Sequence, residues 1–131
     1  MDADRNVSGA RGEAYLLVDG EQRPILFTNR ALADAERLTG KTTLQLMRGV
    51  QSNELSISDV AQMLLVGMEH ARRESRAGGR AYTIADAWAV MDACGFGPVA
   101  AAVMEAIAAV MSYDGGKAAD ESPPLGTGSA S

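Results

Sequence analysis

The sequence has little of the side-chain chemistry that metal sites and active sites use. It contains one cysteine and one histidine in 131 residues. A single cysteine cannot form an internal disulfide, and these two residues cannot supply the Cys/His cluster of a structural zinc site. We therefore predict neither a metal site nor a bound cofactor.

The few reactive side chains also lack the neighbours that catalysis needs. His70 has no serine, cysteine or carboxylate at a suggestive spacing, so it is expected at the surface or at a boundary. Cys94 falls on an apolar helical stripe, where a thiol behaves as a small hydrophobic group. Asp34, Asp59 and Asp86 stand at expected helix starts, where the helix dipole explains them. The sequence predicts no enzyme.

One short string has the ending of a phosphate-binding loop. Gly40-Lys41-Thr42 matches the last part of the pattern G-x-x-x-x-G-K-[ST], but Ala35 occupies the place of the first glycine. The residues before it read as a helix rather than a strand, so the loop that cradles phosphate is missing. Gly40 is better explained as the residue that ends a helix.

Positive charge and long hydrophobic runs are scarce as well. Twelve Lys and Arg face seventeen Asp and Glu, which gives a net charge of -5 and argues against nucleic acid as a partner. The longest nearly uncharged run, 93–112, is broken by glycine and proline and contains Glu105, so no membrane segment is expected. Residues 1–12 lack the apolar core of a secretory signal, which favours the cytoplasm.

The remaining composition is that of one small domain. With 47% hydrophobic residues, the chain is predicted to fold as a single helical domain with an N-terminal hairpin over residues 13–113. Residues 1–12 are expected to be a flexible N-terminus. Residues 114–131 are expected to be a disordered tail, because Leu125 is their only large apolar side chain.

The first element of this domain is a β-hairpin. Its strands are predicted over 13–18 and 23–27, around an Asp-Gly turn. A two-residue turn would set Leu17 opposite Gln22, whereas a four-residue loop over 19–22 sets apolar residues opposite each other, so we predict the longer loop. The pairs in that register are Leu17 with Pro24 and Leu16 with Ile25.

The rest of the chain reads as about five helices, so the fold class is mainly α (α+β). Capping residues, apolar spacing and glycines mark the limits. The expected helices run from 28 or 29 to Gly40, from Thr43 to Val50, from Ser56 to Gly78-Gly79, from Thr83 to Gly95, and from Pro98 to Met111. The Ser56 start has the form of a capping box.

The last helix is unusual because nearly every side of it is apolar. Glu105 is its only charge. A helix that is apolar all round is either enclosed by its own domain or covered by something else. Both interpretations stay open: the helix belongs to the core, or it forms an interface with itself or with a partner.

The methionines allow two interpretations as well. The chain has seven, and five of them, namely Met63, Met68, Met91, Met104 and Met111, fall in the last three expected helices. Methionine fills gaps in a core that is short of aromatic residues, and it also adapts to irregular partner surfaces. Composition does not decide between these roles.

The order of the parts resembles the tail assembly chaperones of long-tailed phages and gene transfer agents. A hairpin around an Asp-Gly turn precedes TNRALADAERLTGKTTLQLM, then LSISDVAQMLLVGMEHA, then YTIADAWAVMDACGFGPVAAAVMEAIAAVM. The resemblance covers 14–111. It lies in patterns of small and apolar residues rather than in catalytic groups.

The resemblance implies a protein that assists assembly without catalysis. Members of this family bind the tape measure protein in the cytoplasm of the host bacterium, help tail tube subunits to gather around it, and are usually absent from the finished particle. Many exist in a second, longer form made by a ribosomal frameshift, for which Gly116-Lys117 is a candidate position. The alternative is a structural tail component, a tail tube or minor tail protein, that forms a homo-oligomer through its apolar last helix.

Partner binding would then use an apolar groove. We expect the groove between the last three helices, where an amphipathic helix of the partner can lie. The predicted partner-binding residues are Met63, Met68, Trp88, Met91, Val103, Ile107 and Met111.

Overall fold

A computed structural model of the chain describes residues 12–52, 54–76 and 78–113. The expectations for the N-terminal segment, for the C-terminal tail and for a frameshift at Gly116-Lys117 fall almost wholly outside the described residues. Gly12, the last residue of the expected flexible N-terminus, is described. Its carbonyl accepts a hydrogen bond from the Phe27 N–H at 2.7 Å, which extends the hairpin by one pair.

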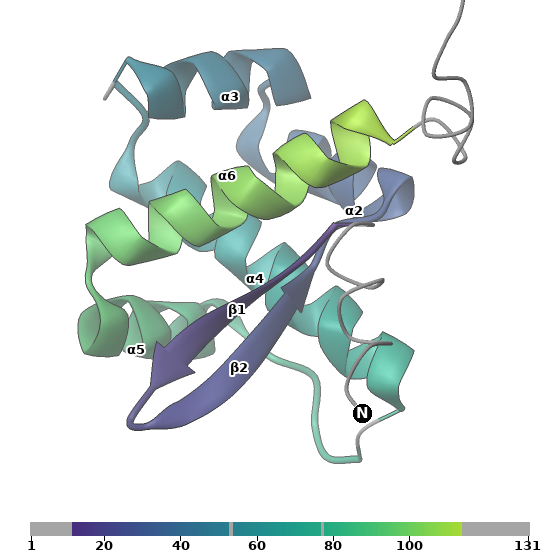
Figure 1. Cartoon of the computed structure of the whole chain (residues 1–131), viewed down its shortest axis with the longest axis vertical. Coiled ribbons are helices and arrows are strands. Elements are labelled where there is room, and N and C mark those ends of the chain that lie inside the picture. Colours follow the sequence, from purple (N-terminus) through teal and green to yellow (C-terminus); the bar gives the residue numbers. More distant parts are fainter. Residues whose placement is uncertain (1–11, 53, 77, 114–131) are drawn as a thin grey trace, which may run out of the picture.

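The described chain is a hairpin followed by five helices, as predicted (Figure 1). The fold class, mainly α with a short N-terminal hairpin, is confirmed. The elements in order are β1 (Glu13–Val18), β2 (Glu21–Leu26), α2 (Asn29–Thr39), α3 (Thr43–Gln51), α4 (Ile57–Ser75), α5 (Ile84–Cys94) and α6 (Phe96–Ser112).

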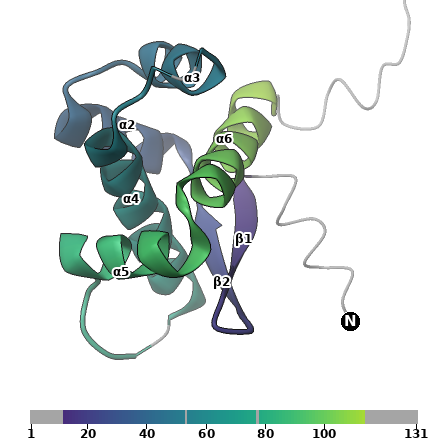
Figure 2. The same cartoon turned by 90° about the vertical axis from the view of Figure 1, so that its left-hand side faces the viewer.

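The long helix α4 is the centre of the fold. It contacts β2, α2, α5 and α6, whereas α3 lies above α6 at one end of the molecule (Figure 1 and Figure 2). Gly67 lets the hairpin approach α4 closely, because a Cβ atom there would lie 2.9 Å from Phe27 Cε1 and 3.0 Å from Ile25 Cβ. The hairpin gains from α4 the support that two strands alone would lack.

The hairpin register differs from the predicted one. Leu17 pairs with Gln22 and Val18 with Glu21, around a two-residue turn of Asp19 and Gly20. Both turn residues have positive φ, 54° and 83°, as a type I′ turn requires. The predicted register is shifted by two residues, which keeps every side chain on the same face, so the apolar pattern alone could not exclude it. The buried Ala14 of β1 lies opposite the buried Ile25 of β2, and β1 also contacts α5 and α6.

Most helices begin and end close to the residues that the sequence predicted. Two limits and one cap differ from the prediction. Gly40 ends α2 in the left-handed conformation, as expected. Arg76, with φ 57°, ends α4 before the glycines that were expected to do so. Helix α6 begins at Phe96, two residues before Pro98. Ser56 caps α4 by accepting from the Asp59 N–H at 3.0 Å, but the Asp59 carboxylate binds Lys41 rather than completing a capping box.

Candidate functional site

The groove predicted between α4, α5 and α6 is not a surface of the molecule. Five of the seven predicted partner-binding residues are buried, and these are Met63, Met68, Met91, Val103 and Ile107. Their side chains fill the core where these helices meet, so for Met63, Met68 and Met91 the structure favours gap-filling. Val90, rather than Trp88, completes the buried face of α5. Trp88 is 39% exposed and Met111 is 46% exposed.

Among the described residues, those that pack against the last helix cover one side of it. Val99, Val103 and Ile107 lie on its buried face. Its opposite face carries Gly97, Ala101, Met104, Ala108 and Met111, of which Met104 is half-buried and the others are exposed. We call these five residues the α6 seam. Their spacing of four and three residues in alternation places them along one line of the helix, as in the contact line of a coiled coil.

An apolar pocket adjoins the first turns of the α6 seam. It has a volume of about 330 Å³. Its wall on one side comes from α6 and on the other from α3, the following loop and the start of α4. The lining residues are Gly49, Val50, Leu55, Val60, Phe96, Gly97, Ala100 and Ala101. We call it the α3–α6 pocket. Gly97 and Ala101 belong to both the pocket and the seam, so the two form one apolar surface.

The pocket exists because α3 is held above α6 while small residues face the gap. Leu46 fixes α3 to the core with 1% of its surface exposed. The N–H and the hydroxyl of Thr43 donate to the Glu36 carboxylate at 2.7 and 2.9 Å, which lowers the pKa of Glu36. On the facing helix, Gly97 has no atom within 4 Å of the position that a Cβ would take. Short side chains therefore leave the space between α3 and α6 unfilled.

Lys41 contributes to this arrangement through an ion pair with Asp59. Its Nζ lies 2.7 Å from Asp59 Oδ2, which joins the loop between α2 and α3 to the first turn of α4. The lysine of a phosphate-binding loop would instead reach toward bound phosphate. The geometry agrees with the interpretation of Gly40 as a helix end.

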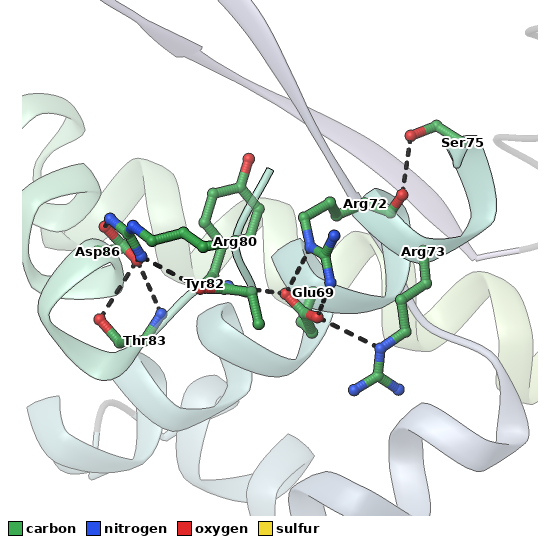
Figure 3. Close-up of polar contacts among 9 residues, drawn as sticks. Glu69, Arg72, Arg73, Ser75, Arg80, Tyr82, Thr83 and Asp86 are labelled. Carbon is green, nitrogen blue, oxygen red and sulfur yellow. Dashed lines mark hydrogen bonds and ion pairs between the residues drawn. The ribbon is translucent and has the colours of Figure 1, made fainter. Parts of the chain in front are cut away.

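A cluster of polar side chains on the other side of α4 is the second candidate site (Figure 3). Glu69 accepts hydrogen bonds from Arg72 Nε at 3.0 Å, from Arg73 Nε at 3.3 Å and from the Tyr82 N–H at 2.9 Å. These contacts, led by Arg72, lower the pKa of Glu69 to about 2. We call Glu69, Arg72, Arg73 and Tyr82 the Glu69 cluster. It anchors the chain between α4 and α5.

A second set of contacts continues this anchoring along the same connection. Arg80 donates to both carboxylate oxygens of Asp86, at 2.8 and 2.9 Å, and the Thr83 N–H donates to the same carboxylate (Figure 3). The guanidinium of Arg80 is the main reason that the pKa of Asp86 is lowered. Each group is used to begin α5, which indicates a structural role.

A pocket of about 210 Å³ beside the Glu69 cluster contains a histidine and aspartate pair. His70 Nε2 lies 2.9 Å from Asp34 Oδ2, and this contact lowers the pKa of Asp34. The residues that line the pocket include no serine, threonine or cysteine as a nucleophile. Its two arginines pair with its two carboxylates, Arg37 with Asp34 and Arg73 with Glu69. The pocket thus has the composition of a salt-bridged helix interface.

Among the described residues, neither Cys94 nor the remaining acidic side chains form a further candidate site. The Cys94 side chain is half-buried and its Sγ donates to the Leu17 carbonyl at 3.2 Å. Within the described ranges, no group of three or more His, Cys, Asp and Glu residues could hold a metal ion. No single helix in these ranges is both long enough and apolar enough to span a membrane. Helices α5 and α6 have that length and hydropathy only when taken together, and the pair is bent by 114°.

Sequence reasoning missed both the α3–α6 pocket and the contact between His70 and Asp34. The pocket depends on how far α3 stands from α6, which no local pattern encodes. The spacing of the α6 seam can be read from the sequence, but in a helix that is apolar on nearly every side it does not identify the exposed face. Comparisons with family models, with curated proteins and with solved structures found no match for this chain.

Proposed function

We propose that this chain is a tail assembly chaperone that binds the tape measure protein of a long-tailed phage or a gene transfer agent and promotes tail tube assembly without catalysis. The observation that carries the proposal is the single apolar surface made by the α6 seam and the α3–α6 pocket. The order of hairpin and helices over 14–111, on which the family resemblance depends, supports it.

The physical mechanism is the capture of one amphipathic helix by another. A tape measure protein is long and exposes apolar stripes before the tube surrounds it. Such a stripe can lie along the α6 seam, which extends about 21 Å from Gly97 to Met111 at the rise of an α-helix. Glycine and alanine permit close approach of the partner backbone, and a large partner side chain can enter the α3–α6 pocket. The net charge of -5 keeps the carrier soluble.

The chaperone acts, under this proposal, in the cytoplasm of the host bacterium and leaves before the particle is complete. Tail tube subunits then replace it along the tape measure protein. The rival function is a structural tail component that self-associates through α6. Mass spectrometry of purified particles separates the two: a chaperone is absent or present in traces, whereas a stoichiometric amount in the particle would refute the chaperone function.

Co-expression provides the direct test. The chain is produced with the long coiled-coil-rich reading frame expected beside its own gene, and the partner is captured through a tag on this chain. Ala101→Arg places a long charged side chain where the seam meets the pocket, and we expect it to abolish capture. Leu17→Arg, which alters an exposed apolar residue on the hairpin, is the matched control and should leave capture unchanged. Equal capture by both variants would contradict the proposed surface.

A further inference from the structure

We infer that the helix bound by the α6 seam carries a basic side chain beside its apolar stripe and that this side chain pairs with Glu105. The inference rests on the proposed function and specifies the chemistry of the partner. It also selects a different protein, rather than a second copy of this chain, as the occupant of the seam.

Glu105 has the position that such a contact requires. It is the only charged residue of α6 and it is exposed. It follows Met104 directly and stands four residues after Ala101 and three before Ala108, so it flanks the seam on the helix surface. No described residue forms a hydrogen bond or an ion pair with its carboxylate. The charge is therefore available at the edge of an apolar surface.

By side-chain size alone, the α6 seam of a second copy would fit against this seam. Ala101, Met104, Ala108 and Met111 are spaced by three, four and three residues, an arrangement that is symmetric about Ala106. Two antiparallel α6 helices could therefore set each alanine against a methionine, as interdigitating layers require. A two-fold interface is self-complementary in this way.

Charge opposes this self-association. The same two-fold axis would cross the helix pair at the level of Ala106 and would bring Glu105 of one copy beside Glu105 of the other, because equivalent flanking positions face each other in an antiparallel pair. Like charges in that arrangement repel. Two copies with a net charge of -5 each repel at longer range as well. A partner helix with lysine or arginine at the flanking position replaces this repulsion by attraction.

The proposal can be tested with two synthetic peptides that form amphipathic helices. Both carry the same leucine stripe, and the positions beside the stripe are lysine in one peptide and glutamate in the other. Fluorescence anisotropy measures their binding to the full chain at low and high ionic strength. We expect the lysine peptide to bind about two- to tenfold more tightly, and we expect added salt to reduce the ratio, because exposed ion pairs are weak and screened.

Variants of Glu105 assign this preference to one carboxylate. Glu105→Gln should reduce the ratio of the two affinities, and Glu105→Lys should invert it. Glu21→Gln makes the same chemical change at an exposed position on the hairpin and should leave the ratio unchanged. Equal binding of the two peptides, or a ratio that Glu105→Lys does not alter, would overturn the inference while leaving apolar capture intact.

Two other outcomes have separate meanings. If neither peptide binds, the proposed function itself fails, and the inference fails with it. If sedimentation shows a dimer that Glu105→Gln strengthens and that excludes both peptides, the occupant of the seam is a second copy, which also overturns the inference. Binding of the lysine peptide to a monomeric chain is the expected result.

Discussion

The backbone N–H of Tyr82 donates to Glu69 Oε1 at 2.9 Å and thereby fixes the connection between α4 and α5 to the side of α4. The same carboxylate accepts from Arg72 and Arg73 on its own helix. Glu69 is one of two buried charged residues in the described part of the chain, and its hydrogen bonds compensate for its burial. Its removal should therefore affect the whole domain.

Glu69→Gln is expected to lower the free energy of unfolding by about 1–3 kcal/mol, because a neutral amide cannot replace the charge-assisted hydrogen bonds. Urea denaturation followed by circular dichroism measures the change. Glu74→Gln, at an exposed position on the same helix, is the control and should change stability by less than about 0.5 kcal/mol. A similar loss in both variants would show that the Glu69 cluster contributes nothing specific.

Glu69 should also make stability depend on acid. Its pKa is lowered from 4.5 to about 2 in the folded protein. As the pH falls below the pKa of Glu69 in the unfolded chain, the unfolded chain takes up a proton before the folded chain does. The stabilisation by Glu69 is therefore present above about pH 4.5 and is lost toward pH 2. The difference in stability between wild type and Glu69→Gln should shrink over this interval. A difference that stays constant with pH would refute the assignment of this acid dependence to Glu69. The carboxylate of Asp86 titrates in both proteins, so its contribution cancels in the difference.

Gly67 is expected to resist substitution although it lies inside a helix. Alanine usually stabilises a helix relative to glycine by about 1 kcal/mol. At Gly67 the added Cβ would meet Phe27 and Ile25, and overpacking of this kind costs about 1–3 kcal/mol. Gly67→Ala should therefore destabilise the protein in urea, whereas Gly97→Ala, with no atom near its Cβ position, should not. A stabilising Gly67→Ala would mean that the hairpin can move away from α4.

The sequence predicted the hairpin and the five helices, since their signals are local. Strand composition, capping residues and the Gly40 stop depend on a few neighbours in the chain. The sequence offered two hairpin registers, one set by a two-residue Asp-Gly turn and one that places apolar residues opposite each other. The structure has the register of the two-residue turn. Leu16 shows why: its side chain is buried although it lies opposite Arg23, and its strand contacts α5 and α6, which occur much later in the sequence.

The turn can be tested through its backbone conformation. Gly20 has φ 83°, which costs an L-residue about 1–2 kcal/mol. Gly20→Ala should lower stability by that amount in thermal or urea denaturation. Gly78→Ala is the control, because Gly78 has neither a positive φ nor an atom close to its Cβ position, and its effect should lie within about 0.5 kcal/mol. Equal effects would argue against a strained two-residue turn.

The candidate surface was harder to predict than the fold. A helix that is apolar on nearly every side does not reveal which face its own domain covers, and Val103 and Met111 look equivalent in such a sequence. The α3–α6 pocket depends on the distance between two helices that are separated in the sequence by the whole of α4 and α5. The packing around Leu46, the contact of Glu36 with Thr43 and the ion pair of Lys41 with Asp59 hold α3 in place, and none of them is visible in a local pattern.

Two aspartate substitutions on α6 distinguish its faces. Val103 is fully buried, so Val103→Asp places a carboxylate without a partner in the core, and a cost of several kcal/mol is enough to unfold a domain of ordinary stability. Ala101 is exposed, so Ala101→Asp should cost only the difference in helix propensity, below about 1 kcal/mol. Circular dichroism and thermal melting should show an unfolded or strongly destabilised Val103→Asp and a folded Ala101→Asp. The folded variant should nevertheless fail to bind the lysine peptide, because its new charge lies in the apolar seam. Unfolding by Ala101→Asp would place the seam in the core instead, and normal peptide binding would remove Ala101 from the contact surface.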